Sequence, residues 1–312
     1  MYTIPGHHHI SMITKNAKSN NHFYREVLGL RRVKLTVNQD APSMYHLFYG
    51  DKTGSPGTEL SFFEIPLVGR THRGTNAITK IGLIVPSEES LVYWQQRLTS
   101  YGVEQSEMST YAGRPALLFE DSEGLRMALI AAPNTKVAHW ETYEGSPVPA
   151  THQIQGMGTV EITVKNKKKL MATLTEIFGY HVAEETATTA LMQSVDNELF
   201  GEIYIIEQDG ESEKPGRGSI HHLAIRVKNE DELIYWDEQV KKRGFMSSGI
   251  VDRFYFKSLY FRESNGILFE IATDGPGFLI DGNIETLGEQ LDLPDFLESK
   301  REEIIASLKS IQ

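Results

Sequence analysis

The chain has 312 residues, of which 40% are hydrophobic and 23% charged, a composition that is typical of a globular protein and excludes a disordered or collagen-like one. Lys and Arg number 31 against 42 Asp and Glu, and the resulting net charge of −11 makes nucleic acid an unfavourable partner. Cysteine is absent, which excludes disulfides, thiol nucleophiles and thiolate metal sites. Any metal must therefore be held by histidine and carboxylate side chains.

Membrane association is also disfavoured. The longest aliphatic runs have four or five residues, whereas a membrane helix needs about 20. The first six residues, MYTIPG, have neither the basic start nor the apolar core of a signal peptide. We therefore expect a cytoplasmic protein with no membrane partner, and leave open whether it forms a homo-oligomer.

Four segments of the chain repeat one order of signals: an apolar strand, a helix closed by glycine, and further strands leading to a second glycine and a last apolar strand. The two glycines are 28 residues apart in the first segment and 22 apart in the other three. Each segment therefore reads as a βαβββ module, and the predicted fold class is α+β. The predicted modules span residues 5–66, 74–132, 156–208 and 218–275.

The predicted elements follow in chain order. The opening strands start at His9, Lys80, Thr159 and His222, and the helices end at Gly29, Gly102, Gly179 and Gly244. Each of the last three helices has an apolar stripe at helical spacing, as in Leu233, Trp236 and Val240. Ser87 and Asn229 are the predicted N-caps of the second and fourth helices.

The modules group into domains. Residues 1–134 and 153–275 are predicted to form two domains of two modules each, joined by a proline-containing linker over 135–152. A tail over 276–312 includes a predicted helix from Pro294 to about Leu308. A site with ligands from the first and fourth modules requires these two modules to share a pocket, which leaves the second module to pair with the third.

Histidines gather at the openings of the first and fourth modules, as His7–His9 and His221–His222. The acid of a possible ligand set comes from the last strand, where Glu270 follows Gly266 by four residues in an otherwise apolar segment. A buried carboxylate is costly unless it is paired or bound to a metal. His9, His222 and Glu270 would form the facial triad of two imidazoles and one carboxylate that non-haem Fe(II) oxygenases use.

The same positions in the other modules hold residues that are unsuitable as metal ligands. Lys80 and Thr159 replace the histidines in the second and third modules, and glycine spacing puts Ala128 and Ile205 at the position of Glu270. The second pocket should therefore be free of metal. In the first module, the residue that corresponds to Glu270 is Ser61.

Three longer motifs resemble a known family. They are Gly6-His-His-His-Ile10, Gly218-Ser-Ile-His-His-Leu223 and the segment from Leu259 to Phe278. Together with the modules they resemble the vicinal oxygen chelate superfamily, with its paired half-barrel domains, and within it the hydroquinone 1,2-dioxygenase branch that includes the ring-cleaving dioxygenases induced by methylhydroquinone. The resemblance implies Fe(II) ligands at His9, His222 and Glu270.

The same resemblance implies four further catalytic residues, namely His8, His221, Arg253 and Tyr260. His8, His221 and Tyr260 are candidates for acid–base work, and Arg253 could fix an anionic oxygen. Neighbouring residues of a strand normally point to opposite faces, so each histidine pair can serve one pocket only where the strand twists or bulges.

The expected function is Fe(II)-dependent cleavage of a substituted hydroquinone with incorporation of both atoms of O2, in aromatic catabolism or quinone detoxification. Mn(II) remains open as the metal because ligand type discriminates the two ions poorly. One alternative is a glyoxalase-type metal-dependent lyase or isomerase, with Glu64 as a fourth ligand, although Glu64 is expected on the opposite strand face from Ser61. The other is a resistance protein that binds a quinone or drug.

Overall fold

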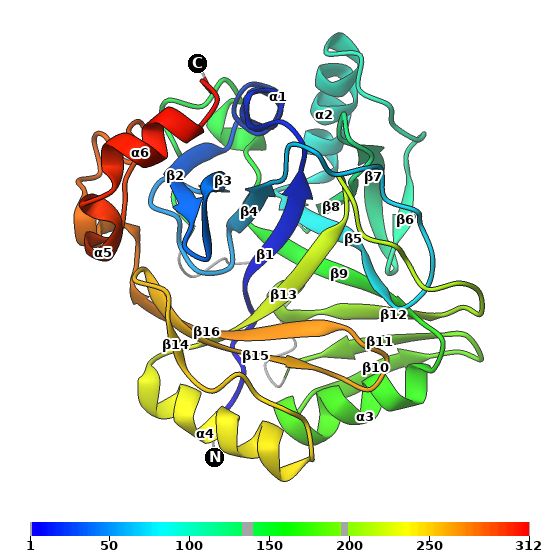
Figure 1. The fold of residues 1–312 in the computed structure, drawn as a ribbon. Helices are drawn as coiled ribbons and strands as arrows, with labels where there is room; N and C mark the ends of the chain where they lie inside the picture. Colours follow the sequence, from blue (N-terminus) through cyan, green and yellow to red (C-terminus); the bar gives the residue numbers. More distant parts are fainter. Residues whose placement is uncertain (1, 133–139, 195–198, 312) are drawn as a thin grey trace.

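The computed structural model describes residues 2–132, 140–194 and 199–311. Within these residues the strands form two eight-stranded sheets, each built from two βαβββ modules (Figure 1). This architecture confirms the predicted α+β fold of paired half-barrels. None of the helices in the described part of the chain is long and apolar enough to cross a bilayer.

The first and second modules contain the following elements: β1 (His7–Thr14), α1 (Ala17–His22), the π-helical turn η1 (Phe23–Val27), β2 (Arg31–Asn38), β3 (Ala41–Gly50), β4 (Glu59–Glu64), β5 (Ala77–Val85), α2 (Glu88–Ser100), β6 (Ser109–Tyr111), β7 (Arg114–Glu120) and β8 (Arg126–Ala131).

The remaining elements are η2 (Ala150–His152), β9 (Met157–Val164), α3 (Lys167–Phe178), β10 (His181–Glu185), β11 (Thr189–Gln193), η3 (Leu199–Gly201), β12 (Ile203–Glu207), β13 (Ile220–Val227), α4 (Glu230–Lys242), β14 (Val251–Asp252), β15 (Phe256–Arg262), β16 (Leu268–Pro276), η4 (Phe278–Asp281), α5 (Asp295–Glu298) and α6 (Arg301–Ser307).

The first helix of each module begins with a side-chain N-cap. A side chain before each helix accepts a hydrogen bond from the backbone N–H three residues later, and the four capping residues are Asn16, Ser87, Asn166 and Asn229. These bonds satisfy donors that have no partner within the helix. The two N-caps predicted from the sequence are thereby confirmed.

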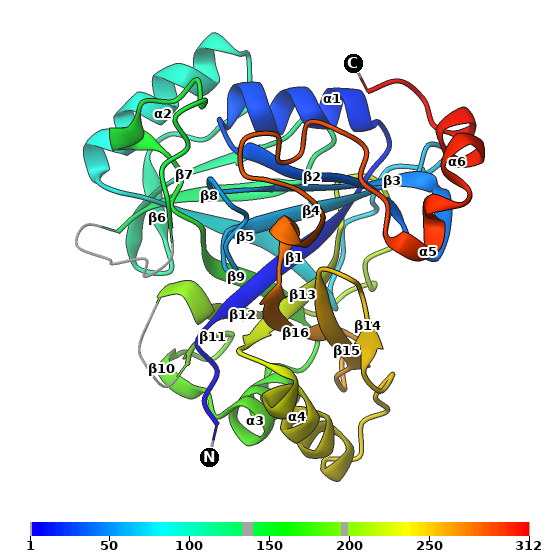
Figure 2. The same cartoon turned by 90° about the vertical axis from the view of Figure 1, so that its left-hand side faces the viewer.

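Strand pairing joins modules that are far apart in the sequence. The order β14-β15-β16-β13-β1-β4-β3-β2 unites the fourth module with the first, and β10-β11-β12-β9-β5-β8-β7-β6 unites the third with the second. In Figure 2, β1 runs beside β13, with which it pairs antiparallel. The predicted pairing of modules is therefore confirmed.

Helix packing, in contrast, joins consecutive modules. The rings of Phe178 on α3 and Trp236 on α4 lie 5.9 Å apart, and both helices lie at the bottom of Figure 1. Arg97 on α2 donates to the carbonyl of Val27 at the end of η1 over 2.8 Å. The domain boundaries over 1–134 and 153–275 remain a prediction, and residues 133–139, which include the start of the 135–152 linker, lie outside the described residues.

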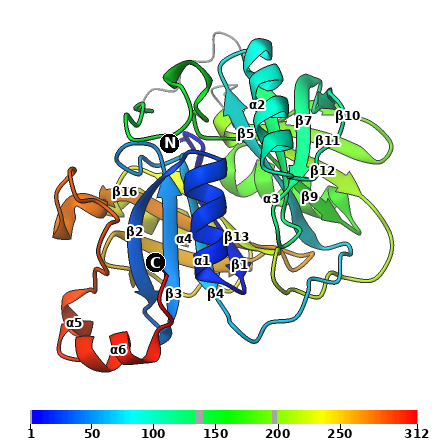
Figure 3. The ribbon, with the colours of Figure 1, turned by 90° about the horizontal axis from the view of Figure 1, so that it is seen from above.

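The tail runs beside β2, the edge strand of the first sheet, and Figure 3 shows α5 and α6 next to β2 and β3. The fully buried ammonium of Lys34 on β2 donates to Asp281 and Asp292 of the tail, over 2.7 Å each. Two short helices, α5 and α6, stand where one helix was predicted, and Pro294 precedes the first of them. The chain departs from helical geometry at Lys300 between them.

Candidate metal centre and its cavity

The candidate site lies where β1 and β13 pair. His9 lies opposite Ala224, and His222 lies opposite Ser11, so each histidine faces the residue two positions after the other one. Side chains two residues apart share a face of a sheet. This symmetric register places both imidazoles on one face of the sheet, next to Glu270 of β16.

Two register shifts in the same strand pair occur at His8 and His221. The pairing passes from His7 to His9 on β1, and on β13 it passes from His222 to Ile220. Each shift leaves one histidine out of the ladder, as in a β-bulge. The condition for both histidines of a pair to approach one site, a twist or bulge in the strand, is thus met at both pairs.

Three side chains converge within this seam, and all are almost completely buried. Nε2 of His222 lies 2.8 Å and Nε2 of His9 lies 3.2 Å from Oε2 of Glu270, while the two nitrogens are 3.4 Å apart. The other carboxylate oxygen, Oε1, accepts a hydrogen bond from Ser258. The arrangement leaves three potential ligand atoms within reach of one ion.

A second histidine fixes the tautomer of His9. Nε2 of His8 donates to the carbonyl of Thr273 over 3.0 Å, which leaves Nδ1 of His8 as an acceptor. Nδ1 of His9 lies 2.9 Å away and must donate to it. Consequently Nε2 of His9 carries a lone pair and faces the site, as a metal-ligating imidazole does.

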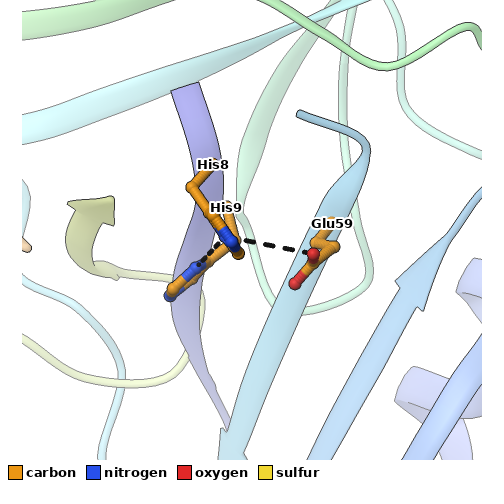
Figure 4. A group of neighbouring side chains, drawn as sticks. All are labelled: His8, His9 and Glu59. Atoms are coloured by element: carbon orange, nitrogen blue, oxygen red, sulfur yellow. Dashed lines mark hydrogen bonds and ion pairs between the residues drawn. The ribbon is translucent and has the colours of Figure 1, made fainter. Parts of the chain in front are cut away.

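Glu59 lies behind these two histidines. Figure 4 shows His8 and His9 on β1 and the Glu59 carboxylate on β4, with Oε1 of Glu59 3.9 Å from Nδ1 of His8. Burial lowers the pKa of His8 well below its usual value, and burial, followed by the charge of Asp51, raises the pKa of Glu59 well above its own. Burial therefore favours the neutral form of both side chains. Glu59 was not singled out by its sequence.

The fourth module repeats this arrangement. Nδ1 of His221 lies 2.7 Å from Nδ1 of His222. With a metal bound at Nε2 of His222, the proton of this ring would be on Nδ1, which would donate to Nδ1 of His221. Desolvation lowers the pKa of His221 to about 4 although its side chain is partly exposed, so the ring is neutral near pH 7, and acceptance at Nδ1 would leave its proton on Nε2.

The chemistry of the three converging atoms fits a cation. In the described residues, Oε2 of Glu270 has no hydrogen-bond donor. Two nitrogen lone pairs and a carboxylate oxygen repel one another unless a positive charge lies between them. The group could therefore hold a divalent metal with open coordination positions.

A cavity of about 430 Å³ opens on the three residues. His221, Arg253 and Tyr260 line it, whereas His8 is not among its lining residues and lies behind His9. Burial raises the pKa of the Tyr260 hydroxyl, which therefore stays protonated. Nε of Arg253 lies 3.4 Å from that hydroxyl, and its Nη1 lies 3.2 Å from Asp40 at the β2–β3 turn.

The sequence reasoning missed His46, which also lines the cavity. It lies on β3, opposite Phe63 of β4, and its side chain shares the cavity face with Phe48. The alternation of side chains along β3 is only a weak signal for a cavity residue, because it indicates that His46 and Phe48 share a face but not what that face contacts.

Comparison with known proteins agrees with this fold. A model of the Glyoxalase/Bleomycin resistance protein/Dioxygenase superfamily matches residues 6–129 and 156–271. The chain belongs to this superfamily. A further member is the "Putative ring-cleaving dioxygenase MhqA" of Bacillus subtilis (strain 168), which is 46% identical over 99% of both chains.

Two more superfamily relatives are similar over nearly the whole chain. The "Chlorohydroquinone/hydroquinone 1,2-dioxygenase" of Sphingobium indicum is 26% identical over 98% of this chain and 96% of its own. The crystal structure of a "putative dioxygenase" from Bacillus subtilis has a TM-score of 0.92 and 30% identity, and the match covers 100% of this chain and 99% of that one.

Glu64 does not join the converging group. Its Oε1 accepts a hydrogen bond from the backbone N–H of Ala17 at the start of α1, over 2.8 Å. Ser61 lies opposite Ser11, just as Glu270 lies opposite the equivalent Ala224, so the glycine spacing assigned Ser61 correctly.

At the corresponding positions of the second sheet, a glutamate binds each of the residues that replace the two histidines. Nζ of Lys80 lies 2.7 Å from Glu161, and Thr159 donates to Glu202 over 2.6 Å. Strand register puts Tyr204, and not Ile205, at the position of Glu270, because Tyr204 lies opposite Glu161. That part of the prediction was wrong by one residue, since Gly201 belongs to the 3-10 turn η3.

Proposed function

We propose that this protein is a ring-cleaving dioxygenase that uses Fe(II), held by His9, His222 and Glu270, to open substituted hydroquinones. The observation that carries the proposal is the convergence of two imidazole nitrogens and one carboxylate oxygen in the wall of a cavity. Such a facial set leaves room for substrate and O2 on the same ion. The names of the relatives support the same reaction class.

The other residues have separable roles in this proposal. Bound Fe(II) would activate O2 and favour loss of the proton from the substrate hydroxyl that it binds. His8 holds the tautomer and orientation of His9, because it lies behind that ring and outside the cavity lining. His221 keeps an Nε2–H for proton transfer, and Tyr260 and Arg253 offer hydrogen-bond donors to a substrate oxygen.

The net reaction needs no further reagent. One ring carbon–carbon bond beside a hydroxyl breaks, and both atoms of O2 enter the product. The ring supplies the electrons that reduce O2, so no external reductant is consumed. We place this activity in the breakdown or detoxification of aromatic compounds in the cytoplasm.

Anaerobic reconstitution with Fe(II), or with Mn(II) in parallel, followed by O2 uptake on a panel of hydroquinones and catechols, tests the proposal. We expect one O2 consumed per hydroquinone and a ring-opened product. Isomerisation of a glutathione hemithioacetal without O2 uptake would establish the glyoxalase-type alternative instead. Tight quinone binding without turnover would establish a resistance protein.

A further inference from the structure

His46 carries a polar atom that the proposed chemistry does not yet use. His46 is among the residues that line the cavity, its Nε2 is buried, and no hydrogen-bonding group of the described residues reaches this atom. A buried polar atom without a partner is costly and rare in folded proteins. An atom of this kind in the wall of a binding cavity is therefore a candidate contact for a ligand.

Two aromatic rings hold the imidazole of His46 in place. The ring centroid of Phe48 lies 4.1 Å away and that of Phe63 lies 4.2 Å away, with Phe63 stacked on the imidazole. Phe63 in turn lies 6.5 Å from the ring of His222. One aromatic ring thus separates His46 from the converging metal ligands.

The two walls of the cavity differ in polarity. Strand register makes β3 of the first module equivalent to β15 of the fourth, so that Phe48 corresponds to Tyr260 and His46 to Ser258. The hydroxyl of Ser258 donates a hydrogen bond to Glu270. His46 instead lies opposite Phe63 of β4, which offers no hydrogen-bonding group. His46 Nε2 is therefore an isolated polar group on a wall of aromatic rings.

The charge state of His46 suits a neutral ligand. Burial lowers the pKa of His46 well below its usual value, so its imidazole is neutral near pH 7. A neutral imidazole has one N–H and one lone pair, which complement a hydroxyl group.

We infer that His46 is a specificity-determining residue whose Nε2 forms a hydrogen bond with the substrate oxygen farthest from the metal. This inference rests on the proposed function and narrows it. A hydroquinone carries its hydroxyls at opposite ends of the ring, so one can bind the metal while the other reaches past Phe63 to His46. A catechol carries both at one end and leaves Nε2 unpaired.

The inference predicts a binding preference that can be measured without turnover. Wild-type protein loaded with Fe(II) is titrated anaerobically with hydroquinone and with 4-methylphenol, which has a methyl group in place of the second hydroxyl. We expect hydroquinone to bind about tenfold more tightly, the usual effect of one buried hydrogen bond. His46→Phe should abolish this preference, and His46→Gln, which keeps an amide near Nε2, should retain part of it.

Controls separate this role from a structural one. His181→Phe, at an exposed position of β10 in the other sheet, should keep the wild-type preference. Bound iron is measured in every variant, because loss of metal would lower both affinities together and leave their ratio unchanged. The ratio therefore reports the contact of His46 with the second hydroxyl.

The outcomes are distinguishable. Wild-type protein that cleaves hydroquinone but binds both ligands equally overturns the role of His46 and leaves the proposed function intact, as does an undiminished preference in His46→Phe. Protein that binds no hydroquinone overturns both proposals. If circular dichroism shows that His46→Phe does not fold, the role of His46 is still tested by the ratio of the two ligand affinities in the wild type and in His46→Gln.

Discussion

Ser61 and Glu270 occupy equivalent positions in two modules that share one sheet. Each lies directly opposite the residue two places after a site histidine, Ser61 opposite Ser11 and Glu270 opposite Ala224. The hydroxyl of Ser61 is 2.6 Å from that of Ser11, while the carboxylate of Glu270 meets the two imidazoles. The module pair therefore provides one carboxylate where its pseudo-symmetry has room for two.

Ser61→Glu should convert the three-residue group into a set of two histidines and two carboxylates. We expect Fe(II) to remain bound but O2 uptake on hydroquinone to fall by about tenfold or more, because the new carboxylate takes a coordination position that substrate or O2 needs. Metal content and O2 uptake measure the two effects. Ser61→Ala is the matched control and should keep both, and a Glu variant with wild-type turnover would contradict the assignment.

Removal of any one of the three converging side chains should release the metal. His9→Ala, His222→Ala and Glu270→Gln are each expected to weaken Fe(II) binding by about 100-fold or more, because each deletes one of the three proposed protein ligands. Chelator competition and metal analysis measure the affinity. Glu64→Gln is the control, since Glu64 bonds to the start of α1, and it should bind metal normally. Full occupancy in all three ligand variants would refute the site.

His8 should act on metal affinity through His9. His8→Ala removes the acceptor for Nδ1–H of His9, and we expect a loss of about 10- to 100-fold in Fe(II) affinity, as is usual for partners of ligand histidines. His8→Asn can place its amide oxygen near the position of Nδ1 and should recover part of the loss. Equal affinities for the wild type and the Ala variant would show that His8 does not orient His9.

Asp121 should make stability depend on pH. Its carboxylate accepts hydrogen bonds from Tyr24 and from the backbone of Glu123 and Leu125, but burial raises its pKa from 3.8 to about 6. Between these values only the folded protein holds the proton. The stabilisation is therefore complete below pH 3.8 and is lost as pH rises through 6.

Comparison of the wild type with Asp121→Asn isolates this effect, because the other titrating groups are common to both proteins. From pH 4.5 to pH 7 the free energy of unfolding of the wild type should fall by about 1 to 2 kcal/mol relative to the variant, allowing for partial solvent access to Asp121. Urea unfolding at the two pH values measures the difference. A difference that does not change with pH would argue against a raised pKa.

Regular spacing made much of this protein readable from its sequence. The glycine intervals located the four modules and identified Ser61 as the counterpart of Glu270, because a repeated βαβββ unit keeps equivalent strand positions at equal distances from equivalent turns. The histidines and the buried acid then indicated which modules must pair. The spacing failed only at Ile205, where the 3-10 turn at Gly201 shifts the strand by one residue.

Only the tertiary structure decided what faces the converging ligands. His46 and Glu59 lie on strands in which the alternation of side chains indicates the sheet face of each residue but not the residues that it contacts. His46 lines the cavity because the twisted sheet brings β3 around toward β15, and Glu59 lies behind His8 because β4 runs beside β1. Tautomers were likewise settled by distant contacts, such as that of His8 with the Thr273 carbonyl, 265 residues away. Local periodicity cannot encode such contacts, since they depend on how the strands are assembled.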